Sequence, residues 1–91
     1  MATTAVLING QKMLFMTVPR EDGRLDVDIF LANEDYLPTG TPSIGVSPEV
    51  ETEEVYHKRL RKDAYEKGHY LPEGSTDREW DPGGQAGENP G

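Results

Sequence analysis

The 91-residue chain contains no cysteine, which excludes both a disulfide framework and a thiolate metal centre. Large apolar residues are also few. Leu, Ile, Val and Phe together account for 18 of the 91 residues, close to the roughly 20% below which chains tend toward disorder. The sequence therefore predicts one small domain of marginal stability, held together by packing and hydrogen bonds alone.

Basic residues are scarce, with nine Lys and Arg against 17 Asp and Glu and a formal net charge of −8. The only basic cluster lies at residues 58–62, in a segment whose acidic residues nearly cancel it. Binding to a phosphate backbone requires clustered Lys and Arg, so direct nucleic-acid binding is not expected. The charge instead favours protein partners with a basic surface.

Long apolar runs are absent, and no uninterrupted run exceeds four residues. A membrane-spanning helix needs about 20 such residues, so no membrane segment is predicted. Residues 1–4 lack the basic start and the long apolar core of a signal peptide. We therefore expect a protein of the cytoplasm or of a virus particle that is not exported by a signal peptide.

An Asn9-Gly10 pair separates two apolar runs, residues 5–8 and 13–18. Asn-Gly between apolar runs is a strong hairpin signal, because both residues tolerate the positive φ of a type I′ turn. A two-residue loop predicts the cross-strand pairs Ile8 with Gln11, Leu7 with Lys12, and Val6 with Met13.

Apolar and acidic residues then alternate, which predicts a third, half-buried strand. The expected inward residues are Leu25, Val27, Ile29 and Leu31, and the expected outward residues are Asp26 and Asp28. Phe30 interrupts the polar face and is a candidate contact residue. The sequence thus predicts an α+β protein whose first part is a three-stranded antiparallel β-meander over about residues 4–32.

Residues 36–47 are rich in proline and glycine and are expected to form an extended connector without regular structure. It would pack on its own sheet or on a partner. Ser47 as N-cap and Pro48 in the first turn predict a helix over about residues 48–67, ended by Gly68. Its expected apolar stripe is Val55, Tyr56, Leu60 and Ala64, and the basic residues 58–62 are expected to form a solvated face.

The expected domain covers residues 1–71, and residues 72–91 form an acidic tail, rich in proline and glycine, that is flexible or ordered by a partner. Trp80 is the only large apolar residue of the tail. It is either an anchor on a partner or a cover for the chain's own sheet. The candidate partner-binding residues are Trp80, Asp77, Glu79, Asp81, Tyr65, Tyr70, Leu71 and Phe30.

Catalytic patterns are missing. His57 and His69 are the only histidines, their spacing does not suit a metal, and both are expected to be solvated or to cap the helix. Acid pairs such as Asp26/Asp28 and Glu53/Glu54 lie where water is expected, without a pocket to raise a carboxyl pKa. No phosphate loop or nucleophile motif occurs. No catalytic residue, cofactor or metal is predicted.

These features indicate a small non-enzymatic structural or adaptor protein that docks in a larger protein assembly, a build that suits an accessory component of a virus particle. The alternative is an acidic inhibitor or regulator that covers a basic, nucleic-acid-binding site on a target protein. Binding by charge mimicry should weaken steeply with salt, whereas docking through apolar segments should not. The partner, the organism and the oligomeric state are left open.

Replacing Gly68 with Val should destabilise the domain, because a β-branched residue resists the positive φ expected at the end of the helix. The measurement is the thermal unfolding midpoint of Gly68→Val beside that of the parent chain. An unchanged midpoint would mean that the helix does not end there.

Overall fold

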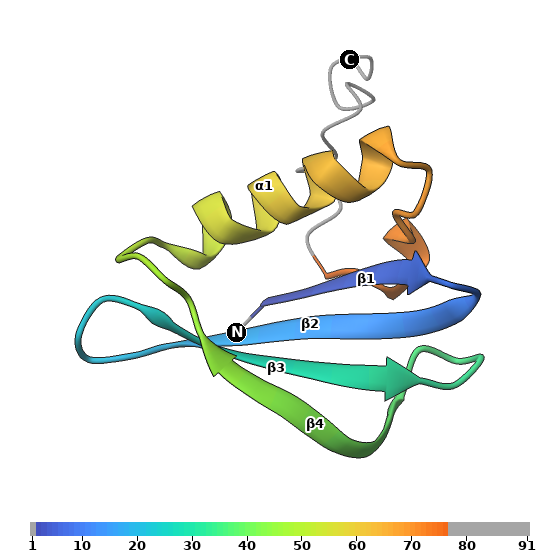
Figure 1. Cartoon of the computed structure of the whole chain (residues 1–91), viewed down its shortest axis with the longest axis horizontal. Helices are drawn as coiled ribbons and strands as arrows, with labels where there is room; N and C mark the ends of the chain where they lie inside the picture. The colour runs from blue at the N-terminus through green and yellow to red at the C-terminus, as the bar shows by residue number, and fades with distance from the viewer. Residues whose placement is uncertain (1, 77–91) are drawn as a thin grey trace.

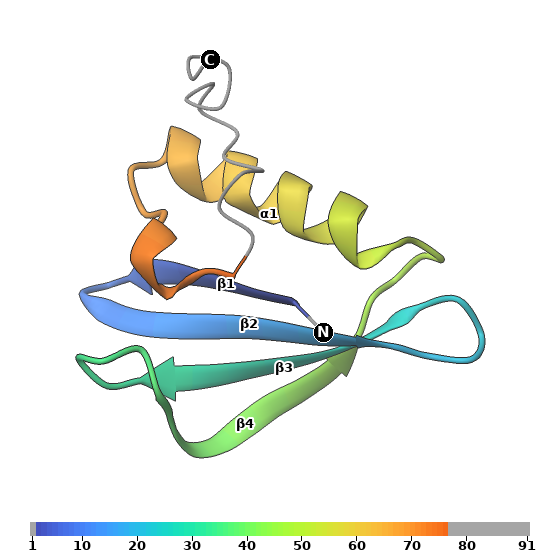
Figure 2. The same cartoon turned by 180° about the vertical axis from the view of Figure 1, so that it is seen from behind.

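The computed structural model describes residues 2–76 and has two layers, a four-stranded antiparallel sheet and one helix on one face of it (Figures 1 and 2). The strand order in the sheet is the order in the chain, β1-β2-β3-β4. The elements are β1 (Ala2–Ile8), β2 (Gln11–Pro19), β3 (Leu25–Ala32), β4 (Pro38–Val46), α1 (Glu53–Glu66) and a short 3-10 turn η1 (Pro72–Gly74).

The first three strands form the predicted meander. Asn9 and Gly10 have φ values of 51° and 79°, as the type I′ turn requires. The register of β1 on β2 pairs Ile8 with Gln11, Leu7 with Lys12 and Val6 with Met13, so the predicted hairpin is confirmed pair by pair. Local turn chemistry was sufficient here because a two-residue loop leaves only one register.

The prediction of a connector without regular structure over residues 36–47 is wrong, because most of these residues form the fourth strand, β4. β4 pairs antiparallel with β3, from Asp26 opposite Val46 to Ala32 opposite Pro38. Proline is tolerated here because β4 lies at the edge of the sheet, where one side of the strand has no ladder to break. The register shifts between Ile29 and Leu31, and this irregularity absorbs the proline- and glycine-rich stretch.

The helix begins later than expected. Thr52 is its N-cap, and the Thr52 hydroxyl accepts a hydrogen bond from Val55 N at 3.1 Å. Ser47 is not a cap, because it continues the pairing of β4 with β3. Its Oγ accepts from Leu25 N at 2.9 Å and its N–H donates to Leu25 O at 2.8 Å. Glu53 and Glu54 do lie in the first turn, as the helix dipole favours.

The chain turns back at Gly68, whose φ of 76° confirms the predicted end of the helix. Residues 69–76, called the return segment below, then run along the outer edge of β1. This pairing includes the first part of the predicted tail, residues 72–76. The backbone hydrogen bonds are Leu7 N to His69 O (2.8 Å), Leu71 N to Ala5 O (3.0 Å) and Thr76 N to Thr3 O (3.0 Å).

A small core lies on the sheet face opposite α1. Ala5, Leu14 and Ala32 are buried there, and the partly buried Met16, Phe30, Tyr36 and Leu71 pack around them. Tyr36 comes from the β3–β4 loop and has a φ of 62°, which hydrogen bonds from the backbone of this loop to Asn33 support. Its ring lies against Gly74 of η1, and Lys12 Nζ is 4.5 Å from the ring centre. The loop and the return segment therefore close this face together.

Replacing Gly74 with Ala should destabilise the fold by about 1–3 kcal/mol, because a Cβ at this position would overlap the Tyr36 ring. The matched control is Gly45→Ala, where a Cβ meets no atom within 4 Å. Chemical denaturation of both variants tests the contact. Equal stability of the two would show that Tyr36 does not rest on Gly74 in solution.

Candidate functional site

Polar side chains fill the space between α1 and the first two strands. Thr4, Thr17, His57 and Arg61 are fully buried there. The expectation of a solvated or capping His57 is wrong, and so is a fully solvated basic face, since Arg61 points inward. Glu53, His57 and Arg61 are spaced by four residues, so they share one face of the helix. This four-residue spacing is visible in the sequence and could have indicated the buried face of the helix. The residues at these positions are polar, however, whereas the sequence analysis looked for an apolar stripe.

These side chains form one hydrogen-bonded chain. Arg61 Nε donates to Thr4 Oγ1 at 3.1 Å, and Thr4 Oγ1 lies 2.7 Å from His57 Nδ1. His57 Nε2 lies 2.8 Å from Thr17 Oγ1, which donates to Glu53 Oε2 at 2.7 Å. With the ring hydrogen on Nε2, every link has one donor and one acceptor, running from the guanidinium to the carboxylate.

The carboxylate end of the chain is ionised at neutral pH. Burial works to raise the pKa of Glu53, but the pKa lies below its ordinary value, and the hydrogen bond from the Thr17 hydroxyl is the largest of the interactions that lower it. A folded-state pKa below the unfolded one means that Glu53 stabilises the fold at neutral pH. This contribution is lost as the pH falls through the folded pKa.

The buried chain joins α1 to the sheet and offers no room for a substrate. A nucleophile and its base need space nearby for the reacting atom. Thr4, Thr17 and His57 have no exposed surface, and the cavities found beside α1 in the described part of the chain are lined by other residues. Within residues 2–76 no group of His, Asp and Glu is placed to hold a metal ion. The arrangement supports a structural role.

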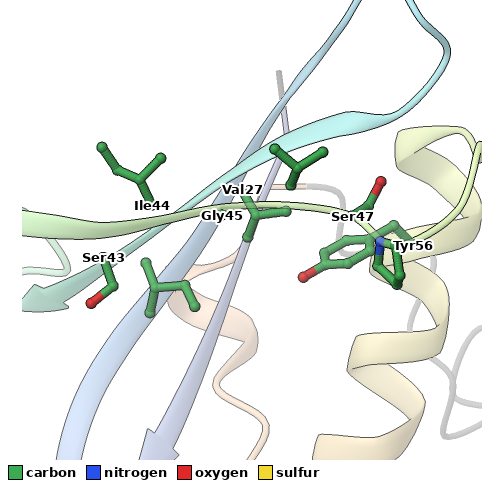
Figure 3. Close-up of a pocket in the computed structure, with 9 residues that line it drawn as sticks. Val27, Ser43, Ile44, Gly45, Ser47 and Tyr56 are labelled. Atoms are coloured by element: carbon green, nitrogen blue, oxygen red, sulfur yellow. The ribbon is translucent and has the colours of Figure 1, made fainter.

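A groove lies open on the same face of the sheet, between the β3–β4 side and the start of α1 (Figure 3). Its volume is about 230 Å³, enough for one or two side chains rather than for a drug-sized ligand. We call it the β4 groove. Its lining includes Val27 and Ile29 of β3, Ser43 and Gly45 of β4, and Tyr56 of α1.

Two features keep the β4 groove open. α1 packs mainly against β1 and β2, so only the start of the helix, at Tyr56, reaches the β3–β4 side, and the rest of that face has no helix over it. β4 also presents small residues on this side, Ser43 and Gly45, and a Cβ at Gly45 would meet no atom within 4 Å. Ile44 points to the opposite side of β4 and is 75% exposed (Figure 3). β4 therefore exposes the apolar side chain of Ile44 on one face and, on the other, a backbone that the small residues Ser43 and Gly45 leave accessible to solvent.

The structure separates the predicted partner-binding residues. Trp80, Asp77, Glu79 and Asp81 lie outside the described residues. Tyr65 is exposed on α1. Tyr70, in the return segment, is half-buried and forms an antiparallel β-bridge with Val6 of β1. Leu71 and Phe30 are both partly buried and pack against the small core. The expected inward stripe of α1 fails at Val55, which is 51% exposed, and the inward face of β3 fails at Leu31, which is 48% exposed.

Comparison with known proteins finds no matching family model, no similar curated protein and no similar solved structure. Among residues 2–76, no helix has the length and apolar character needed to cross a membrane.

Replacing Thr17 with Val should destabilise the fold by about 1–3 kcal/mol, because it removes the hydroxyl between His57 and Glu53 at nearly constant volume. Thr41→Val, at an exposed position on β4, is the matched control and should be nearly neutral. Urea unfolding of both variants provides the comparison. If Thr17→Val were as stable as the control, the hydrogen-bonded chain would not hold α1 in place.

Proposed function

We propose that the protein is a small non-enzymatic adaptor or structural subunit, which docks in a larger protein assembly by accepting an extended segment of a partner protein beside β4. The observation that carries the proposal is the contrast between the two edges of the sheet. The return segment pairs with the edge of β1, whereas nothing among residues 2–76 pairs with the outer edge of β4.

The backbone of β4 is oriented for such pairing. Ser47 N donates to Leu25 O, and alternate residues of an antiparallel strand direct their backbone groups to the same side. Ser43 and Gly45 therefore face β3, while Ile44 and Val46 direct their N–H and C=O groups outward. An added strand would satisfy these groups through main-chain hydrogen bonds, and its side chains would enter the β4 groove.

Only half of this edge carries the features that usually prevent strand addition. Pro38, Pro42 and the register shift disrupt the first part of β4. The second part, residues 43–46, has no proline and no charged residue. Unprotected sheet edges are rare in proteins that remain alone, so this short stretch supports a docking role.

A subunit that works by docking suits an accessory component of a virus particle, the setting proposed from the sequence. The alternative, an acidic inhibitor that covers a basic site, needs carboxylates free to face a target. Several of them are engaged within the chain: Asp22 and Asp26 with Arg20, Glu51 with Arg59, Glu66 with Lys62, and Asp63 with Lys67. This internal pairing favours docking over charge mimicry.

Selection from a display library of random peptides tests the proposal. Peptides enriched on the parent chain should lose about tenfold or more in affinity for Gly45→Phe, which fills the β4 groove. Thr41→Phe adds the same side chain outside the groove and should bind as the parent does. Circular dichroism and the unfolding midpoint establish that both variants are folded.

Three results would count against docking at β4. The first is a library that yields no enriched peptide, and the second is a set of peptides that bind Gly45→Phe as well as the parent. The third is binding that falls steeply between low and high salt and is unchanged in Gly45→Phe, which would favour the acidic inhibitor.

A further inference from the structure

Asp28 of β3 lies on the sheet face opposite α1, one strand in from the open edge of β4. It is the cross-strand neighbour of Ile44, and Asp26 is the neighbour of Val46. Arg20 binds Asp26 at 3.0 Å, whereas the Asp28 carboxylate forms no ion pair or hydrogen bond within residues 2–76. A half-buried carboxylate next to an exposed apolar residue therefore lies one strand away from the docking edge.

We propose, on the basis of the proposed docking at β4, that the docked segment is a strand in which apolar residues alternate with Lys or Arg. The apolar residues enter the β4 groove on the α1 side. The basic residues lie on the opposite face, where their aliphatic stems cover Ile44 and Val46 and their charged ends reach Asp28.

The spacing of strands supports this arrangement. Neighbouring strands lie about 4.8 Å apart, so an added strand would be about 10 Å from β3. Lys and Arg side chains can bury their stems along apolar surface while the charged end extends to an acceptor. A shorter side chain directly beside Ile44 would leave both the apolar surface and Asp28 without a partner.

The two sides of the added strand see different surroundings. On the α1 side its neighbours are Val27, Ile29 and Tyr56, so an apolar residue loses the least hydration there. Arg59 lies 5.8 Å from the centre of the Tyr56 ring, but it is bound to Glu51 at 2.9 Å. Period-two alternation in the partner follows because successive side chains of a strand point to opposite faces.

Charge also argues against a second copy of this chain at the same edge. Each copy carries a net charge of −8, and an antiparallel β4–β4 pair would bring the Asp26 and Asp28 carboxylates of both copies to one face. The two sets would lie three strand spacings apart, roughly 14 Å, so their repulsion is modest at physiological salt. The β4 strand of a second copy, however, carries no cation that could reach Asp28. A basic segment from another protein would supply one instead.

Three synthetic hexapeptides test the inference by NMR titration at about 0.15 M salt, a condition that screens non-specific attraction. They alternate Lys-Val, Ser-Val and Glu-Val, with both ends blocked. The Lys-Val peptide should shift the amide signals of residues 43–47 saturably and bind about two- to fivefold more tightly than the Ser-Val peptide. The Glu-Val peptide should bind most weakly.

Two variants separate charge recognition from docking. Asp28→Asn should abolish the advantage of the Lys-Val over the Ser-Val peptide and leave Ser-Val binding unchanged. Asp35→Asn, on the exposed β3–β4 loop, is the matched control and should keep the advantage. Ile44→Pro removes an outward N–H without breaking the pairing with β3, so it should weaken all three peptides together.

Each of the other outcomes contradicts either docking at β4 or the recognition of a basic side chain by Asp28. If the peptides bind at residues 43–47 with equal affinity, docking stands and charge recognition fails. If no peptide shifts these signals up to millimolar concentration, docking at β4 fails as well. If the Lys-Val peptide shifts signals all over the surface and still does so in Ile44→Pro, its binding is non-specific attraction. If sedimentation shows a dimer of the parent chain that Ile44→Pro dissociates, the edge binds a second copy of this chain instead.

Discussion

The hydrogen-bonded chain from Arg61 to Glu53 determines where α1 lies. A buried guanidinium and a partly buried carboxylate are unfavourable without partners, and here each ends a series of hydroxyl and imidazole groups from β1, β2 and the helix. The helix must therefore lie over the two strands that supply Thr4 and Thr17. Because this position is off-centre, most of the face of β3 and β4 is left without a helix over it.

The two edges of the sheet differ, because one is paired with another segment of the described chain and the other is not. The return segment covers β1, and the contact of Gly74 with Tyr36 fixes that segment to the β3–β4 loop. β4 receives no such cover within residues 2–76. The open edge, the small residues of β4 and the offset helix coincide at one place, and their coincidence there is what supports a docking role.

Local signals in the sequence were sufficient for some elements. Asn9-Gly10 fixed both the turn and the register of the first hairpin, and Gly68 marked the end of the helix. β4 could not be recognised in this way, because its prolines and glycines are tolerated only through its edge position, which is a property of the whole sheet. Ser47 resembled a cap for the same reason, since its true partner, Leu25, is brought near only by the fold.

The candidate site was the hardest part to predict. A buried His57 and Arg61 contradict the usual pattern of an amphipathic helix, and only the threonines opposite them make their burial tolerable. The β4 groove depends on where α1 stops covering the sheet, which no residue spacing reveals. The alternation of apolar and acidic residues in β3 was visible in the sequence. That Asp26 and Asp28 lie beside Val46 and Ile44 was not, because it depends on the pairing of β3 with β4.

The return segment has a consequence for the order in which the molecule forms. β1 precedes the other described strands in the chain, yet its outer edge is completed by residues 69–76, which are synthesised after all four strands and α1. Among the described residues, the sheet therefore has two bare edges until this segment emerges and one afterwards. Contacts between such distant parts of a chain slow folding, and bare edges favour association with other chains. During synthesis the sheet is therefore most vulnerable to aggregation before residues 69–76 are added.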